Sequence, residues 1–201
     1  MIYNNSSKIE LDKKAIANNV DFIKSQIGES VTLSSVVKAN AYGHGIDEMV
    51  PELEKNGVRH FSVFSSFEAR KVHKVSKKKA TIMVMGDIAA ADLSWIVEKQ
   101  IECFVYNFHM LHLLLAEAKK QKTCVCIHIE LETGMNRHGF CQKQYEELFK
   151  LLIEEKENYI FQGLCTHFAG AESSANYKRI HDQQKVFLEG LSMFREQNLI
   201  P

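Results

Sequence analysis

The stretch "VVKANAYGHG" at residues 36–45 places a lysine directly after an apolar run and follows it with two glycines, a tyrosine and a histidine. The run that leads into Lys38, "VTLSSVV" at 31–37, has the β-branched content of a strand. Lysine is an unfavourable residue at the end of a buried strand unless its amine is used there. The stretch therefore predicts a strand that presents a chemically useful amine.

Five further apolar runs resemble strands, and amphipathic segments separate them. The runs lie at 60–65, 81–86, 102–106, 123–131 and 159–167. Between them, apolar residues at helical spacing predict helices at 16–27, 47–56, 108–120, 145–152 and 180–194. Asp12 is the expected N-cap of the first helix and Gly28 its end, and Ser65-x-x-Glu68 predicts a capping box that opens another.

The alternation of strand and helix is typical of a parallel α/β fold, in which both faces of the strands are buried. Six strong strands are present, each followed by a helix. A closed TIM-type barrel has eight such units and typically about 250 residues, whereas this chain has 201. From the pattern alone, the chain is either an open doubly wound sheet or a piece of a longer barrel.

The composition is that of a globular protein, with 45% apolar residues and 25 basic residues against 25 acidic ones. The equal numbers of basic and acidic residues argue against a protein whose main function is to bind nucleic acid or a membrane. No signal peptide and no membrane-spanning run are seen. The five cysteines, an odd number, favour reduced thiols in the cytoplasm, and Cys124-x-Cys126 has the wrong spacing for zinc, so we expect no metal site.

Polar side chains that suit catalysis follow three of the predicted strands. Lys38 and Tyr42 follow the first, Arg137 follows the strand at 123–131, and His167 closes the strand at 159–167. Since active groups gather at the carboxyl ends of parallel strands, we expect the amine, guanidinium and imidazole to converge. A desolvated lysine amine suits Schiff-base chemistry, and pyridoxal phosphate is its common partner.

The amino-acid sequences of three segments resemble motifs of the alanine racemase family. "VVKANAYGHG" resembles the family signature, and "TGMNRHGF" (133–140) and "GLCTHFAGAE" (163–172) resemble its next two blocks in the same order. The resemblance implies an incomplete TIM-type barrel of about six βα units. It also implies that residues 1–201 form the partial N-terminal pyridoxal-phosphate-binding domain, with the C-terminal β domain absent.

The resemblance further implies a role for each residue at the matching positions. Lys38 would bind pyridoxal phosphate and act as one of two catalytic bases, and Tyr42 would bind the cofactor phosphate. Arg137 would hold the phenolic oxygen, and His167 would lie against the ring. The implied enzyme is an isomerase that interconverts L- and D-alanine for peptidoglycan precursors.

Two departures from the family pattern affect these expectations. Glu130 stands where many members carry a carbamylated lysine that steadies the arginine, and we hypothesise that its carboxylate supplies that negative charge permanently. The second catalytic base, a tyrosine of the C-terminal domain, and most phosphate contacts of the family would lie beyond residue 201. We therefore expect little or no activity from this fragment, and self-association as a homodimer or another oligomer.

Three alternatives remain open from the sequence. The chain could be a non-catalytic barrel that holds pyridoxal phosphate, or a fragment that binds no cofactor. It could also be another barrel enzyme that uses pyridoxal phosphate, such as a decarboxylase, although the motifs "AYGHG" and "TGMNRHGF" make this alternative less favoured than the racemase family.

Overall fold

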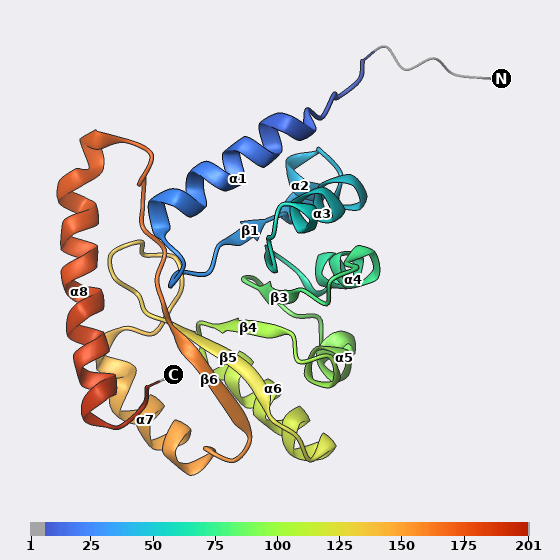
Figure 1. Cartoon of the computed structure of the whole chain (residues 1–201). Coiled ribbons are helices and arrows are strands. Elements are labelled where there is room, and N and C mark those ends of the chain that lie inside the picture. The colour runs from blue at the N-terminus through green and yellow to red at the C-terminus, as the bar shows by residue number, and fades with distance from the viewer. Residues whose placement is uncertain (1–6, 201) are drawn as a thin grey trace. The chain divides into compact units, whose positions relative to one another are not determined.

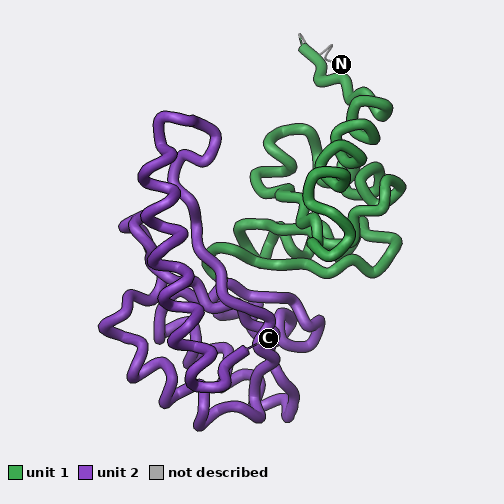
Figure 2. Tube along the Cα trace, turned by 60° about the vertical axis from the view of Figure 1, so that its left-hand side comes forward, with its two compact units in different colours: residues 1–87 green, residues 88–201 purple. Residues whose placement is uncertain are grey.

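The computed structural model of the protein describes residues 7–200. The chain divides into two compact units, residues 1–87 and residues 88–201, which Figure 2 colours separately. Each unit contains three strands that pair in parallel with their sequence neighbours, and helices connect them (Figure 1). The prediction of a parallel α/β fold is therefore confirmed in both units.

The first unit follows the predicted order of strands and helices. Its elements are α1 (Lys13–Ile27), β1 (Ser34–Val36), α2 (Lys38–Tyr42), α3 (Ile46–Lys55), β2 (His60–Val63), α4 (Ser66–Val75) and β3 (Thr81–Val84). Helix α1 begins as predicted, because the Asp12 side chain accepts hydrogen bonds from the backbone N–H groups of the first turn. It ends at Gly28, and the capping box of Ser65 and Glu68 opens α4.

The second unit repeats the arrangement with longer strands. Its strands are β4 (Glu102–Val105), β5 (Val125–Glu130) and β6 (Tyr159–Cys165). Its α-helices are α5 (Leu93–Glu98), α6 (Phe108–Gln121), α7 (Tyr145–Glu154) and α8 (Tyr177–Glu196), and short 3₁₀ turns occur at η1 (Ala90–Asp92), η2 (Gln142–Gln144) and η3 (Ser174–Asn176). Helix α5, only six residues long, is the helix expected after the third strand, for which the sequence pattern indicated no clear bounds.

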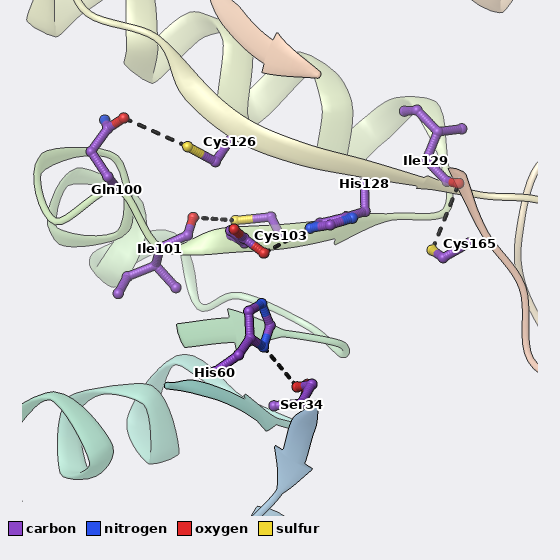
Figure 3. A network of polar contacts seen from close by, with 11 residues as sticks. Ser34, His60, Gln100, Ile101, Cys103, Cys126, His128, Ile129 and Cys165 are labelled. Atoms are coloured by element: carbon purple, nitrogen blue, oxygen red, sulfur yellow. Dashed lines mark hydrogen bonds and ion pairs between the residues drawn. The ribbon is translucent and has the colours of Figure 1, made fainter. Parts of the chain in front are cut away.

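Neighbouring strands are also joined by polar side chains (Figure 3). In the first unit, His60 Nδ1 of β2 lies 2.7 Å from the Ser34 hydroxyl of β1. In the second unit, His128 Nε2 of β5 lies 2.8 Å from a carboxylate oxygen of Glu102 on β4. Each contact gives a partly buried polar group a partner within its own unit, which lowers the cost of its burial.

All six predicted strands are present, although each is shorter than its apolar run. The expectation that they are buried on both faces is wrong for β1 and β6, where Val36 is 39% exposed and Ile160 44% exposed. Within its unit each of these strands pairs on one side only, with β2 or with β5. In residues 7–200 we find no helix of the length and apolar character needed to cross a membrane.

An aromatic cluster forms part of the core of the second unit. The ring of Phe194 on α8 packs edge-on against Tyr145 and Phe149 of α7, with centroids 5.8 and 4.8 Å away, and it stacks on Phe161 of β6 at 6.1 Å. Phe194 is completely buried. The cluster therefore attaches α7 and α8 to β6 by apolar contact.

We predict that Phe194→Ala destabilises the chain by about 3–5 kcal/mol, because it removes a buried ring and leaves a cavity. Urea unfolding followed by circular dichroism measures the change. Phe22→Ala is the matched control, because Phe22 on α1 is 64% exposed. Equal effects of the two substitutions would contradict the packing described here.

Candidate functional site

The turn after β1 has an unusual backbone. Residues Lys38–Tyr42 form a short helical turn. This turn is left-handed, because φ is between 51° and 54° at its last four residues, Ala39, Asn40, Ala41 and Tyr42. Each non-glycine residue in this conformation costs about 1–2 kcal/mol, less for asparagine. Such strain persists only where surrounding contacts impose it, and it gathers at functional sites.

Hydrogen bonds from side chains hold the left-handed turn in place. Glu68, at the start of α4, accepts the backbone N–H of Ala39 at 2.6 Å with one carboxylate oxygen and that of Phe64 at 2.9 Å with the other. Asn40 Oδ1 accepts the N–H of Ile46, and His44 Nδ1 lies 2.8 Å from the Ala41 carbonyl oxygen. His44 therefore helps to hold the loop rather than being left as a free imidazole.

Lys38 and Tyr42 both lie on this turn, as predicted. The Lys38 side chain belongs to a half-buried residue, and within residues 7–200 its Nζ has no hydrogen bond or ion pair. Tyr42 is 62% exposed. The first unit thus offers an uncommitted amine and a phenol on one structurally constrained turn.

In the second unit, the loop after β5 folds back onto the strand that it leaves. Phe140 donates its N–H to the Glu130 carbonyl at 2.8 Å and accepts the N–H of Glu132 at 3.0 Å. The turn requires Gly139, which has a φ of 111° and whose added Cβ would lie 2.7 Å from the Glu132 nitrogen. The "TGMNRHGF" segment therefore returns over the end of β5.

This return brings Arg137 and His138 to Glu130. Arg137 Nε donates to His138 Nε2 at 3.0 Å, and His138 Nδ1 lies 2.8 Å from Glu130 Oε2. The Arg137 side chain is exposed, whereas that of Glu130 is only 4% exposed. Among the described residues no direct hydrogen bond joins Glu130 to Arg137, because the His138 imidazole lies between the two side chains.

Electrostatics corrects the hypothesis that Glu130 carries a permanent charge. Burial raises the pKa of Glu130 to about 7, with Arg137 opposing and Glu132 adding to the rise. Near neutral pH the carboxyl group is therefore only partly ionised. Burial also works against the charge of Glu132, but hydrogen bonds from the backbone N–H groups of Asn136, Gly134, Arg137 and Met135 bring its pKa below the ordinary value.

His167 lies two residues past β6 on an exposed segment that a buried glutamine holds. Gln183 of α8, 1% exposed, donates to the His167 carbonyl oxygen at 2.9 Å and accepts the N–H of Ala169 at 2.9 Å. It also donates to the Thr133 hydroxyl at 3.1 Å. The charge of His167 acts on His138, so this unit brings His167, His138 and Arg137 into one neighbourhood.

Each unit by itself offers a group that suits a pyridoxal phosphate. In the first unit, the Lys38 amine is free among the described residues. The terminal nitrogens of Arg137 have no hydrogen bond among the described residues, because only its backbone N–H and its Nε are engaged. A guanidinium held at Nε keeps its other donors free for an oxygen of a ligand.

Sequence reasoning missed Glu68, His138 and Gln183 as supporting residues. Gln183 had a readable signal, since it is a polar residue on the apolar face of α8, three residues from Ile180 and four from Phe187. Glu68 was already explained by its capping box, and the motif gave no separate reason to single out His138.

We predict that Glu68→Ala loosens the left-handed turn, because it removes charge-assisted hydrogen bonds worth about 1.5–3 kcal/mol each. Amide hydrogen exchange measured by NMR should show faster exchange at Ala39 and Phe64. The exposed Glu29→Ala is the control and should leave both amides as protected as in the wild type. Unchanged protection of Ala39 in Glu68→Ala would refute the role of this carboxylate.

We predict that Glu130 makes the folded chain less stable as the pH rises from 4.5 to about 7. In this range folded Glu130 still holds a proton that the unfolded chain, with a carboxyl pKa near 4.5, has released. Deprotonation therefore favours unfolding. The stability difference between wild type and Glu130→Gln, from urea unfolding at each pH, should shift toward the variant over this range; two parallel curves would contradict the prediction.

Comparison with known proteins gives a consistent result. A family model described as "Alanine racemase, N-terminal domain" matches residues 11–201. An alanine racemase of Methanococcus maripaludis is 34% identical over 166 residues, which cover 82% of this chain and 44% of that protein. An alanine racemase of Clostridium kluyveri is 37% identical over 169 residues, which cover 82% and 42%. The chain spans about half the length of the curated relatives it matches.

Solved structures agree with the fold. A crystal structure of alanine racemase from Bacillus anthracis with bound L-Ala-P has a TM-score of 0.83 and 26% identity, over 94% of this chain and 48% of that one. Alanine racemase from a D-cycloserine-producing Streptomyces lavendulae, 22% identical over 94% and 49%, has a TM-score of 0.85 and supports the fold alone. The fold class is thus the parallel α/β class of the TIM-type barrel, with six βα units present. This chain belongs to the family defined by the N-terminal domain of alanine racemase.

Proposed function

We propose that this chain is the pyridoxal-phosphate-binding part of an alanine racemase, which interconverts L- and D-alanine. The observation that carries the proposal is the uncommitted Lys38 amine on a turn whose costly backbone is held by Glu68 and Asn40. Strain of this kind is retained where function needs a fixed geometry. Family membership adds the substrate class, since the matched relatives are alanine racemases.

Each proposed site residue has a separate task. Lys38 would bind the cofactor through Nζ and, once the substrate amine has replaced it there, would exchange a proton with the substrate. Tyr42, exposed on the same turn, would hydrogen-bond the cofactor phosphate. Arg137 would donate from its terminal nitrogens to the phenolic oxygen, and His167 would lie against the ring. None of these tasks needs a metal ion.

The chemistry follows from a removable proton on the alanine Cα. Pyridoxal phosphate, when bound, withdraws electrons from that carbon. Lys38 Nζ would then take the proton from one face and could return it there. Inversion needs a second base on the opposite face, which the family resemblance assigns to a C-terminal tyrosine of a partner subunit. Proton exchange on one face is therefore the activity we propose for these residues alone.

The test begins with binding. Wild-type chain mixed with pyridoxal phosphate should develop a visible absorption band that borohydride treatment removes. Mass spectrometry of the reduced protein should then find the cofactor on the peptide that contains Lys38. Lys38→Ala should lose the band, whereas Lys55→Ala, which removes a lysine whose side chain is 63% exposed on α3, should retain it. A band that persists in Lys38→Ala would show that this amine is not the attachment point.

Turnover separates the proposal from the alternative of a non-catalytic pyridoxal-phosphate holder. Incubation of cofactor-loaded chain with L-alanine in D₂O should introduce deuterium at Cα, and nuclear magnetic resonance of the alanine measures it. Binding on Lys38 without deuterium incorporation would favour the holder. Absence of binding would overturn both readings.

A further inference from the structure

The His138 imidazole is held by three side chains of the second unit. Arg137 Nε donates to its Nε2 at 3.0 Å, and Glu130 Oε2 lies 2.8 Å from its Nδ1. The ring of Tyr106, at the end of β4, packs on it with centroids 4.7 Å apart and planes 34° apart. The ring is thus fixed in position and orientation by the ends of β4 and β5 and by its own loop.

These contacts determine which ring nitrogen carries the proton. A neutral imidazole has one donor nitrogen and one acceptor nitrogen, and the contact made by one sets the state of the other. Because an arginine N–H can only donate, Nε2 must be the acceptor. The proton therefore lies on Nδ1, on the side of Glu130.

The surrounding charges keep the ring neutral. Burial holds the pKa of His138 below its ordinary value, and the charges of Arg137 and His167 lower it further, while Glu132 opposes them. Glu130, facing Nδ1, is itself only partly ionised near neutral pH because burial raises its pKa to about 7. The groups around the ring therefore favour the neutral tautomer that the contacts require.

Glu130 and His138 bring two buried polar atoms into contact. Glu130 Oε2 and His138 Nδ1 are both buried, and among the described residues neither has a hydrogen bond of good geometry. A buried polar atom without a partner is costly. They lie 2.8 Å apart, so the two groups are within ion-pair distance of each other, although the angle is not that of a hydrogen bond.

We propose that His138 is a positioning residue that connects Glu130 to Arg137 and so fixes the guanidinium that holds the cofactor. The imidazole takes up only Nε of Arg137 and leaves both terminal nitrogens available. This inference rests on the proposed function for the cofactor contact. The connection from Glu130 through His138 to Arg137 is a property of the protein without cofactor.

The first experiment measures the connection without cofactor. The ¹⁵N NMR chemical shifts of the histidine ring nitrogens should show His138 protonated on Nδ1 and unprotonated on Nε2 at neutral pH. The variant His138→Gln identifies the signals of this residue. Arg137→Met removes the donor to Nε2 and should shift the population toward the other tautomer. A wild-type ring protonated on Nε2, or one unaffected by Arg137→Met, would overturn the proposal.

The second experiment measures pyridoxal phosphate affinity from the visible band. His138→Leu should weaken binding about tenfold or more, because the guanidinium loses its charge-assisted support. His138→Gln should recover part of the loss, since its amide oxygen can accept from Arg137. The control His112→Leu, on the exposed face of α6, should bind as the wild type does.

The outcomes separate this proposal from the proposed function. Unchanged affinity in His138→Leu would overturn the positioning role even if the tautomer is as expected. Loss that His138→Gln does not relieve would point to a purely structural role and would also overturn it. A wild-type chain that binds no pyridoxal phosphate would overturn the proposed function and the cofactor half of this inference, while the tautomer measurement would still decide the connection to Glu130.

Discussion

In each unit the strands pair in parallel with their sequence neighbours, so every connection must cross back as a helix before the next strand begins. This constraint places all strand ends of a unit at one edge of its sheet. In the first unit the turn after β1 therefore lies beside the start of α4, within reach of Glu68. In the second unit the ends of β5 and β6 meet, where the hydroxyls of Thr133 and Thr166 lie 2.7 Å apart.

The turn that carries Lys38 shows how such an edge can hold an unfavourable backbone. Its left-handed residues cost about 1–2 kcal/mol each, and the compensation comes from Glu68 on α4 and from Asn40 and His44 in the turn and the residues that follow it. Glu68 bonds two segments at once, because one carboxylate oxygen accepts from the turn and the other accepts from Phe64, directly after β2. The same carboxylate also completes the cap of α4. The geometry of Lys38 is thus tied to the first turn of α4.

The sequence predicted the elements well and the supporting contacts poorly, for a physical reason. Strand positions and the ends of α1 depend on local patterns, such as β-branched runs, Asp12 and Gly28, and these are readable one segment at a time. The left-handed backbone after Val37 depends on a carboxylate about thirty residues later, and no local rule assigns that to alanines. The ionisation of Glu130 likewise depends on burial, which only the folded unit creates. A motif names residues such as Arg137, but the return of its loop through Gly139 decides which neighbour contacts it.

The imidazole between Glu130 and Arg137 also settles a conflict that a direct ion pair would create. A carboxylate bound side-on to a guanidinium tends to engage two of its nitrogens, which would leave fewer donors for a ligand. A fully ionised Glu130 would moreover be expensive at 4% side-chain exposure. His138 relieves both problems, because it accepts from Nε alone and lies 2.8 Å from a carboxyl group that need not be fully charged. The arginine is thereby restrained while its outer donors stay free among the described residues, as the proposed recognition of a cofactor oxygen requires.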